Sequence, residues 1–180
     1  MDKMYKFVGE LANIDENTLL LDICSGIGTI GLSVGQKAKK IIGIEMVESS
    51  CENAKKNAQN CSTGHKYEVI CSKVEDVIDK VIAENPSVRV VGILDPPRAG
   101  LHPSVIKTLR TCRGLNELVF MACDVNQSKR NILDLCLPES KSRKGPEFAP
   151  ILCTGVDMFP NSPHYETIFY LKRPATINSD

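Results

Sequence analysis

Three glycines in the stretch LLLDICSGIGTIGLSV have the type and spacing of an adenosine-cofactor site. Gly26, Gly28 and Gly31 fit G-x-G-x-x-G, in which a turn between a strand and a helix lets the backbone approach a ligand closely. Glu45 ends the next apolar run, KIIGIE, where a carboxylate can hold a pair of ribose hydroxyls. NAD-dependent enzymes and methyltransferases share this pattern, so the glycines by themselves leave both ligands open.

Asp22 favours a cationic cofactor over a pyrophosphate. It stands at the end of the first apolar run, four residues before Gly26, and gives the pattern D-x-x-x-G-x-G. A carboxylate there can orient the glycine loop and accept a hydrogen bond from a cationic amino-acid group, whereas a doubly charged pyrophosphate would be repelled. We therefore expect S-adenosylmethionine rather than NAD. The alternative is that Asp22 only caps the turn.

A thiol and a carboxylate lie at two further points where apolar runs begin or end. Cys123 follows ELVFMA and precedes polar residues, which predicts a more accessible thiol than the buried cysteine of a protein core. Glu166 lies in VDMFPNSPHYE, directly before the last apolar run. A carboxylate held on a stiff, proline-containing loop can act as a general base.

The segment DPPRAGL, residues 95–101, follows the fourth apolar run. Pro96 and Pro97 cannot donate ladder hydrogen bonds, so they predict a rigid loop that turns into the ligand crevice at the carboxyl ends of the strands. In amino-group methyltransferases an aromatic residue follows the two prolines, whereas this chain has Arg98. A guanidinium there suits a contact with a phosphate or a carbonyl. A purely structural turn is the alternative.

An α/β fold with a doubly wound sheet would bring these residues together. Apolar runs predict strands over 18–24, 40–45, 67–71, 88–94 and 117–122. Helical patterns lie over 5–11, 28–37, 47–60, 74–83, 103–109 and 128–137. The alternation predicts a mostly parallel sheet. Two more runs, 151–159 and 167–172, are too close in sequence for a crossover helix, so we expect an antiparallel C-terminal pair. This Rossmann-like arrangement is typical of S-adenosylmethionine-dependent methyltransferases.

Composition restricts the class of protein. The 180 residues predict a single catalytic domain over 1–175 and a flexible tail over 176–180. Basic and acidic residues each number 22, so no overall positive charge indicates nucleic acid, although local basic clusters occur. The eight cysteines contain no C-x-x-C pair, which argues against a metal site. We found no secretory signal and no apolar run of spanning length, so we expect an intracellular protein with no membrane partner.

Taken together, the motifs resemble the RNA uracil-5-methyltransferases, and most closely the C-terminal catalytic domain of the eukaryotic tRNA (uracil-5-)-methyltransferases. The matching segments are DICSGIGTIGLS, GIE, DPPRAGLH, the cysteine of ACD, and DMFPNSPHYE. The resemblance implies that Cys24, Thr29, Glu45 and Asp95 line the S-adenosylmethionine site, beside Gly26 and Gly28 of the glycine turn. It also implies that Cys123 is the nucleophile and that Glu166 is the proton-abstracting base.

The implied reaction is methyl transfer to C5 of a uridine in tRNA. C5 of uracil is a poor carbon nucleophile, but addition of the Cys123 thiolate at C6 gives an enolate with charge at C5. A base must then remove the C5 proton so that the thiol is eliminated, and Glu166 has that role. Asp95 can hydrogen-bond the pyrimidine edge or the cofactor, and Arg98 is the second substrate-binding candidate.

Two departures from the family pattern keep an alternative open. The family's nucleophile usually lies in S-C-N, whereas this chain has Ala122, Cys123 and Asp124, and a negative Asp124 disfavours a thiolate beside it. The alternative is a catalytically impaired relative that binds S-adenosylmethionine or RNA as a module. A nicotinamide-dependent oxidoreductase is disfavoured because it gives Cys123 and Glu166 no role.

The family's members also carry RNA-binding regions upstream, which this sequence does not contain. We therefore expect a monomeric catalytic piece of a longer chain, in the cytosol or nucleus rather than in the mitochondrion.

Overall fold

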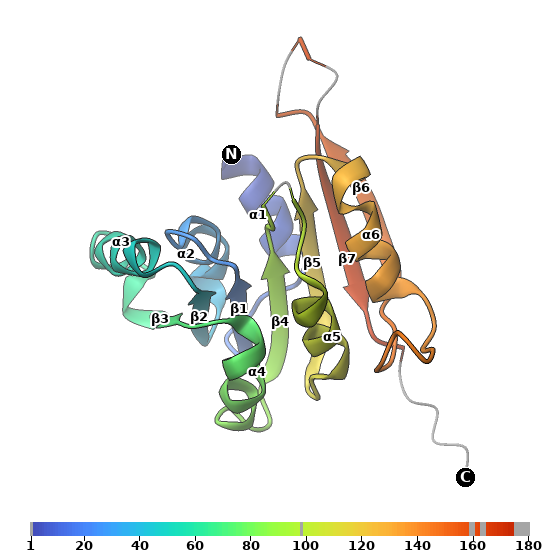
Figure 1. Ribbon diagram of the computed structural model, residues 1–180. Coiled ribbons are helices and arrows are strands. Elements are labelled where there is room, and N and C mark those ends of the chain that lie inside the picture. The colour runs from blue at the N-terminus through green and yellow to red at the C-terminus, as the bar shows by residue number, and fades with distance from the viewer. Residues whose placement is uncertain (1, 98, 159–160, 163–164, 175–180) are drawn as a thin grey trace.

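The computed structural model describes residues 2–97, 99–158, 161–162 and 165–174 (Figure 1). Its strands are β1 (Thr18–Ile23), β2 (Lys40–Glu45), β3 (Tyr67–Cys71), β4 (Arg89–Leu94), β5 (Leu115–Ala122), β6 (Ala149–Val156) and β7 (Glu166–Lys172). Its helices are α1 (Asp2–Leu11), α2 (Thr29–Val34), α3 (Glu48–Gln59), α4 (Val74–Ala83), α5 (Pro103–Thr111) and α6 (Val125–Cys136), with short 3-10 turns η1 (Gly35–Lys37) and η2 (Gly64–Lys66).

The strands form one sheet in the order β3-β2-β1-β4-β5-β7-β6. Strands β1 to β5 are parallel, and β7 lies antiparallel between β5 and β6. The sheet is thus mostly parallel and ends in an antiparallel pair. The predicted fold class is confirmed.

Two apolar layers cover the two faces of the sheet. Successive residues of a strand point to opposite faces, so Leu19 and Leu21 of β1 join one layer and Leu20 joins the other. Helices α4, α5 and α6 pack on the first face, and α1 and α2 pack on the second (Figure 1). Every residue of β1 is buried, which explains why its sequence is a continuous apolar run rather than an alternating one.

Several predicted boundaries differ from the observed ones, as at α1, which begins at Asp2 rather than at residue 5. The helix predicted over 28–37 is shorter, because α2 ends at Val34 and the chain tightens into η1 at Gly35. Helix α6 begins three residues earlier than predicted, since Asp124 caps its first turn. Strand β6 begins at Ala149 and ends at Val156, whereas the sequence predicted 151–159.

Three further features concern the described part of the chain. None of its helices is both long and apolar enough to cross a membrane. No group of three or more histidines, cysteines or acidic residues lies close enough together there to hold a metal ion. All eight cysteines are free thiols.

Candidate active site

A cavity of about 760 Å³ opens at the edge of the sheet where the parallel strands end. Residues that follow four different strands line it: Cys24 after β1, Glu45 to Val47 at the end of β2, Ser72 to Glu75 after β3, and Asp95 and Pro97 after β4. The carboxyl ends of parallel strands are where such folds bind their ligands. The cavity therefore lies where the glycine pattern predicts a cofactor.

Glycine is favoured at each of the three fingerprint positions for a different structural reason. Gly28 has φ +80°, and a Cβ there would lie 2.7 Å from the hydroxyl of Tyr67. Gly31 has no room because a Cβ would lie 2.7 Å from Oδ2 of Asp22. Gly26 also has a left-handed φ, +54°, but a Cβ there would meet nothing within 4 Å. The backbone at Gly26 is thus open to a neighbouring ligand.

Two carboxylates hold the glycine loop in place. Asp22 accepts a hydrogen bond of 2.8 Å from the N–H of Gly31 in α2. Glu45 accepts one of 2.9 Å from the N–H of Gly26 and one of 2.8 Å from that of Val47. Asp22 therefore orients the loop as its position predicts. Its side chain is only 2% exposed and does not line the cavity, so a ligand has no direct access to it.

Burial and nearby negative charge disfavour the ionised forms of several groups around the cavity. Burial, together with smaller contributions from the charges of Asp95 and Glu45, raises the pKa of Asp22 to about 7. Burial and the charge of Glu45 raise the pKa of the Cys24 thiol to about 11. Asp95 is exposed on the rim, yet the loss of water around its carboxylate raises its pKa too. This edge of the sheet therefore favours a positively charged ligand.

Glu166 is a buried carboxylate with an unused oxygen. It begins β7, is 8% exposed, and its Oε1 has no hydrogen-bond partner among the described residues. Burial, with a smaller contribution from Asp95, raises its pKa to about 7. A carboxyl group that titrates near neutral pH is matched to general-base catalysis.

The register of β5 and β7 brings Cys123 and Glu166 to the same end of this strand pair. The antiparallel pairing places Ala122 opposite Thr167. Cys123 directly follows Ala122 and Glu166 directly precedes Thr167, so both residues lie at the same end of the β5–β7 pairing. Cys123 is partly exposed. The two residues thus lie near each other and near Asp95 of the cavity, although neither of them lines it.

Two residues of the first turns of α6 organise this neighbourhood, and sequence reasoning did not assign them these roles. Asp124 accepts hydrogen bonds from the N–H groups of Asn126 and Gln127, at 2.9 and 3.3 Å, and so caps the helix. Asn131 is buried and binds both the N–H and the carbonyl of Leu101, at 2.7 and 3.2 Å. The loop after β4 is therefore tied to the helix that follows Cys123.

The structure brings together most of the predicted site. Cys24, Glu45 and Asp95 line the cavity. Gly26, Gly28 and Thr29 form the loop and the first residue of α2 beside it, without lining it. Arg98 lies outside the described residues, as do 159–160 and 163–164 of the DMFPNSPHYE segment.

Residues at the starts of α4 and α5 form a further wall of the cavity, which the sequence pattern did not predict. Ser104 donates a hydrogen bond of 2.7 Å to Glu75, and Nδ1 of His102 lies 2.7 Å from the Ser104 hydroxyl. All three residues line the cavity. The sequence indicated part of this wall. Because the predicted strand β3 ends at the same edge as β1 and β2, the residues that follow β3 are expected in the same crevice.

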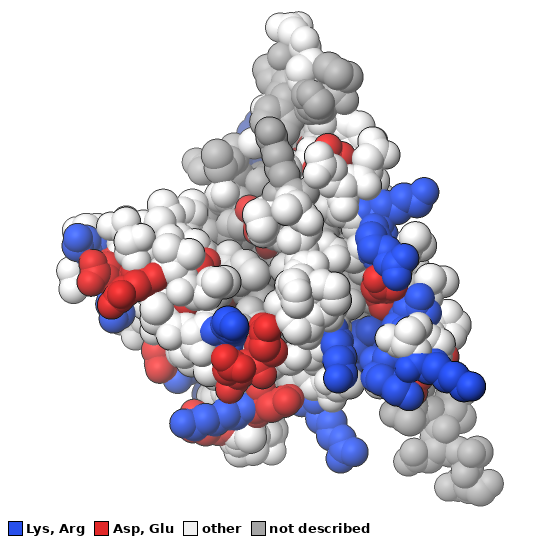
Figure 2. Space-filling model, in the orientation of Figure 1, with Lys and Arg blue, Asp and Glu red and all other residues white. Residues whose placement is uncertain are grey.

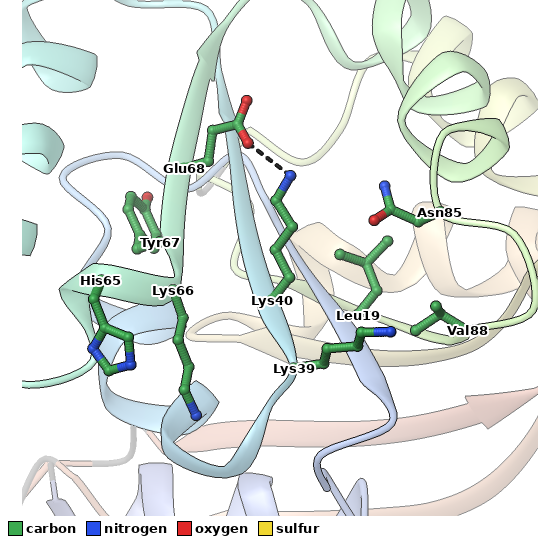
Figure 3. Close-up of a pocket in the computed structure, with 9 residues that line it drawn as sticks. All are labelled: Leu19, Lys39, Lys40, His65, Lys66, Tyr67, Glu68, Asn85 and Val88. Carbon is green, nitrogen blue, oxygen red and sulfur yellow. Dashed lines mark ion pairs between the residues drawn. The ribbon is translucent and has the colours of Figure 1, made fainter.

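A second hollow, of about 640 Å³, lies at the opposite edge, by the amino ends of β1, β2 and β3. Figure 3 shows Lys40 reaching toward Glu68, with which it forms an ion pair of 2.8 Å. Lys66 donates to the carbonyl of Gln36 at 3.2 Å. None of the predicted site residues lines this hollow. We therefore place the candidate active site at the carboxyl edge.

Comparisons with known proteins identify the family and relatives of this chain. A family model described as conserved hypothetical protein 95 matches residues 5–145. The chain is 36% identical over 170 residues to the human tRNA (uracil-5-)-methyltransferase homolog A, covering 94% of the chain and 27% of that protein. It is 34% identical over 177 residues to the mouse homolog B, covering 96% and 36%. The chain thus spans about a third or less of the length of these relatives.

Solved structures show the same fold. A tRNA (uracil-54, C5)-methyltransferase of Pyrococcus abyssi, in complex with S-adenosyl-L-homocysteine, superposes with a TM-score of 0.68 at 24% identity, covering 94% of this chain and 37% of that one. An RNA methyltransferase of Salinibacter ruber, in complex with the same compound, gives 0.61 at 20% identity, covering 99% and 95%. The fold is that of these methyltransferases.

Proposed function

We propose that this chain, which belongs to the family described as conserved hypothetical protein 95, transfers a methyl group from S-adenosylmethionine to C5 of a uridine in tRNA. Its similarity to tRNA (uracil-5-)-methyltransferase homologs A and B supports the substrate class. The observation that carries the proposed chemistry is that Cys123 lies at the same end of the β5–β7 pairing as the buried Glu166, whose Oε1 has no hydrogen-bond partner among the described residues.

The residues of the cavity fit S-adenosylmethionine. When bound, this cofactor supplies an electrophilic methyl group on a positively charged sulfur. Burial raises the pKa of Asp95, so its ionised carboxylate gains from a nearby cation, and a pyrophosphate in the same place would be repelled. Glu45 would hold the ribose end, and Met46 and Val47, which are 66% and 49% exposed, offer apolar surface to a flat base.

Cys123 and Glu166 divide the acceptor chemistry between them. The Cys123 sulfur forms a bond to C6 of uracil, and the electron pair of the C5–C6 double bond moves into an enolate. C5 then takes the methyl group. Glu166 accepts the C5 proton as the bond between sulfur and C6 breaks, which restores the double bond and releases the thiolate. Glu166 must be ionised for this step, and with a pKa of about 7 much of it is ionised at neutral pH.

The capping role of Asp124 supports an enzyme rather than an impaired relative. The Ala-Cys-Asp sequence departs from the family's Ser-Cys-Asn at a position beside the thiol. In the structure one oxygen of Asp124 accepts two N–H bonds at the start of α6, where the helix dipole offsets negative charge. The departure therefore places a largely compensated carboxylate beside Cys123.

A trapped adduct tests the proposal. A tRNA that contains 5-fluorouridine carries fluorine at C5, which cannot leave as a proton, so the bond between Cys123 and C6 persists after methyl transfer. With S-adenosylmethionine present we expect a covalent protein–RNA complex on a denaturing gel. Cys123→Ala should abolish it, and Cys153→Ala, at an exposed thiol on β6, should leave it unchanged. An adduct that survives Cys123→Ala would refute the assigned nucleophile.

A further inference from the structure

A groove rich in positive charge lies on the side of the molecule next to the Cys123–Glu166 pair. It is a cavity of about 350 Å³ between α5, α6 and residues 138–145, and we call it the basic groove. Its lining includes five basic residues and one acidic residue: Lys107, Arg110, Arg130, Arg143, Lys144 and Asp134. Figure 2 shows lysine and arginine side chains gathered at the right, over these elements. The chain as a whole has no net charge, so this excess is local.

The positive charge of the groove is only partly neutralised by the protein. Asp134 is shared between Nε of Arg130, at 2.7 Å, and Nε of Arg143, at 3.3 Å. One carboxylate cannot balance two guanidiniums. Lys107 and Lys144 are exposed and form no ion pair within the described ranges. The groove therefore attracts anions.

A buried arginine fixes the loop that forms the outer wall. Arg110 of α5 is 1% exposed and donates hydrogen bonds to the carbonyls of residues 134, 135, 137, 144 and 145. The N–H of Gly145 also donates to Glu139, at 3.1 Å. These bonds hold Arg143 and Lys144 in place before any ligand arrives. A pre-organised cationic surface binds with a smaller entropic cost than a loose basic tail.

The inner end of the groove meets the acceptor side of the active site. Ala99, in the loop after Asp95, and Gln127, four residues after Cys123, both line it. An acceptor strand with its base at Cys123 would therefore have its backbone at the mouth of the groove. The neighbouring cavity is crowded with carboxylates that repel phosphate, whereas this groove attracts it.

We propose that the basic groove binds the phosphate backbone of the RNA strand that carries the target uridine. This inference rests on the proposed function, since it takes RNA as the substrate. The groove has the chemistry for phosphate because Arg130, Arg143, Lys107 and Lys144 offer forked and point-charge donors. Phosphate contacts set the position and orientation of a strand and leave base recognition to the active site.

The test compares two triple variants in RNA binding. The groove variant carries Lys107→Gln, Arg130→Gln and Lys144→Gln. The control variant carries Lys37→Gln, Lys39→Gln and Lys55→Gln, which removes three exposed lysines elsewhere. The probe is a fluorescent, uridine-containing RNA hairpin, with anisotropy measured over a range of salt concentrations. We expect the groove variant to lose about tenfold or more in affinity at low salt and its salt slope to fall by about 2, with the control close to wild type.

Two further measurements separate this inference from the proposed function. Binding of S-adenosyl-L-homocysteine, followed by calorimetry, should be unchanged in the groove variant, which also shows that it is folded. In the 5-fluorouridine assay, the variant should form the adduct only at a higher RNA concentration than wild type. If both triple variants bind the hairpin like wild type, the groove is not the RNA surface, even if the adduct forms. If only the groove variant loses affinity for RNA and the wild-type protein forms no adduct, the groove is supported as the RNA-binding surface and the proposed reaction is refuted.

Discussion

Strands β5 and β7 carry one glutamate near each end of their pairing. The two glutamates differ in their hydrogen-bond partners and in the direction of their pKa shifts. Glu117, at the amino end of β5, receives two hydrogen bonds from Arg89, at 2.8 and 2.6 Å, one from Tyr170, and an ion pair with Lys172 at 3.4 Å. Burial alone would raise its pKa, but these partners outweigh burial and lower the pKa to about 2. At the other end, Glu166 has an unpartnered oxygen within the described structure, and its pKa rises to about 7.

The difference separates a structural carboxylate from a chemical one. The Glu117 network also reaches the end of α1, because Arg89 donates to the carbonyls of Ala12 and Asn13, both at 2.7 Å. A carboxylate with all its partners present stabilises the fold and is unavailable for proton transfer. A buried carboxylate without them destabilises the fold and is ready to accept a proton. Glutamate thus has a structural role at one end of this strand pair and a proposed catalytic role at the other.

The largest effect should come from removing the base. Glu166→Gln keeps the shape of the side chain but cannot accept the C5 proton, so we expect methyl transfer to uridine to fall by about 10²–10⁴-fold in a single-turnover assay. The 5-fluorouridine adduct should still form, because it needs no proton abstraction. Glu117→Gln is the matched control and should leave the rate of methyl transfer close to wild type. Equal losses of the methyl-transfer rate in both variants would contradict a specific role of Glu166 in the reaction.

The two glutamates should also give opposite slopes of stability against pH. An unfolded glutamate titrates near pH 4.3. Glu117 has a lowered pKa, so its contribution is present above that pH and is lost as the pH falls toward 2. Glu166 has a raised pKa, so stability is lost as the pH rises from about 4 to about 7, by up to about 4 kcal/mol.

Urea unfolding at several pH values measures these slopes. Glu166→Gln should flatten the decline between pH 4 and 7, and Asp22, whose pKa is also about 7, should keep part of it. Glu117→Gln should instead lower the free energy of unfolding above pH 4.3. A Glu117→Gln variant as stable as wild type at neutral pH would show that the network contributes nothing.

Strain at the carboxyl edge can be measured at two glycines of one loop. Gly28→Ala meets both a left-handed φ and the Tyr67 hydroxyl at 2.7 Å, so we expect a loss of about 2–3 kcal/mol in unfolding free energy. Gly26→Ala meets only the left-handed φ, which costs about 1–2 kcal/mol. Thermal and urea unfolding of the two variants gives the difference directly. If Gly26→Ala is the more damaging of the two, the contact with Tyr67 is not the source of strain.

The smallest effect should come from the amino edge. Lys40→Gln removes the ion pair with Glu68, whose side chains are 40% and 55% exposed. Exposed pairs of this kind contribute about 0–1 kcal/mol, and methyl transfer should be unaffected. A large loss of methyl transfer in this variant would give the hollow of Figure 3 a role in the reaction.

Most of the fold follows from local patterns in the sequence. Alternating apolar runs and helical segments predict the parallel sheet, and the sheet predicts that Cys24, Glu45 and Asp95 meet at one edge. The short NSPHYE connection predicts that the last two strands are antiparallel neighbours. These inferences succeed because each strand and helix is recognised from residues close together in the chain, and the parallel arrangement then places the strand ends at one edge.

The features of the fold and of the site that could not be predicted depend on contacts between residues far apart in the chain. Nothing in the sequence pattern places β7 between β5 and β6, and only that order brings Cys123 and Glu166 to the same end of one strand pair. Asn131 reaches Leu101 across 30 positions, and Arg110 fixes a loop 24 to 35 positions away. A single asparagine or arginine in a helix looks like any other polar residue, so these anchors have no local signal.

The position of β7 also has a consequence for the order of assembly during synthesis. Strand β6 leaves the ribosome before β7, yet in the sheet its hydrogen-bonding neighbour is β7, and β5 likewise has one bare edge until β7 arrives. The cofactor-side strands β1 to β4 can pair as they emerge. Because Glu166 is the first residue of β7, the proposed base arrives only after the cofactor cavity has formed. A nascent chain would thus gain its methyl-donor site first and its means of completing the reaction last.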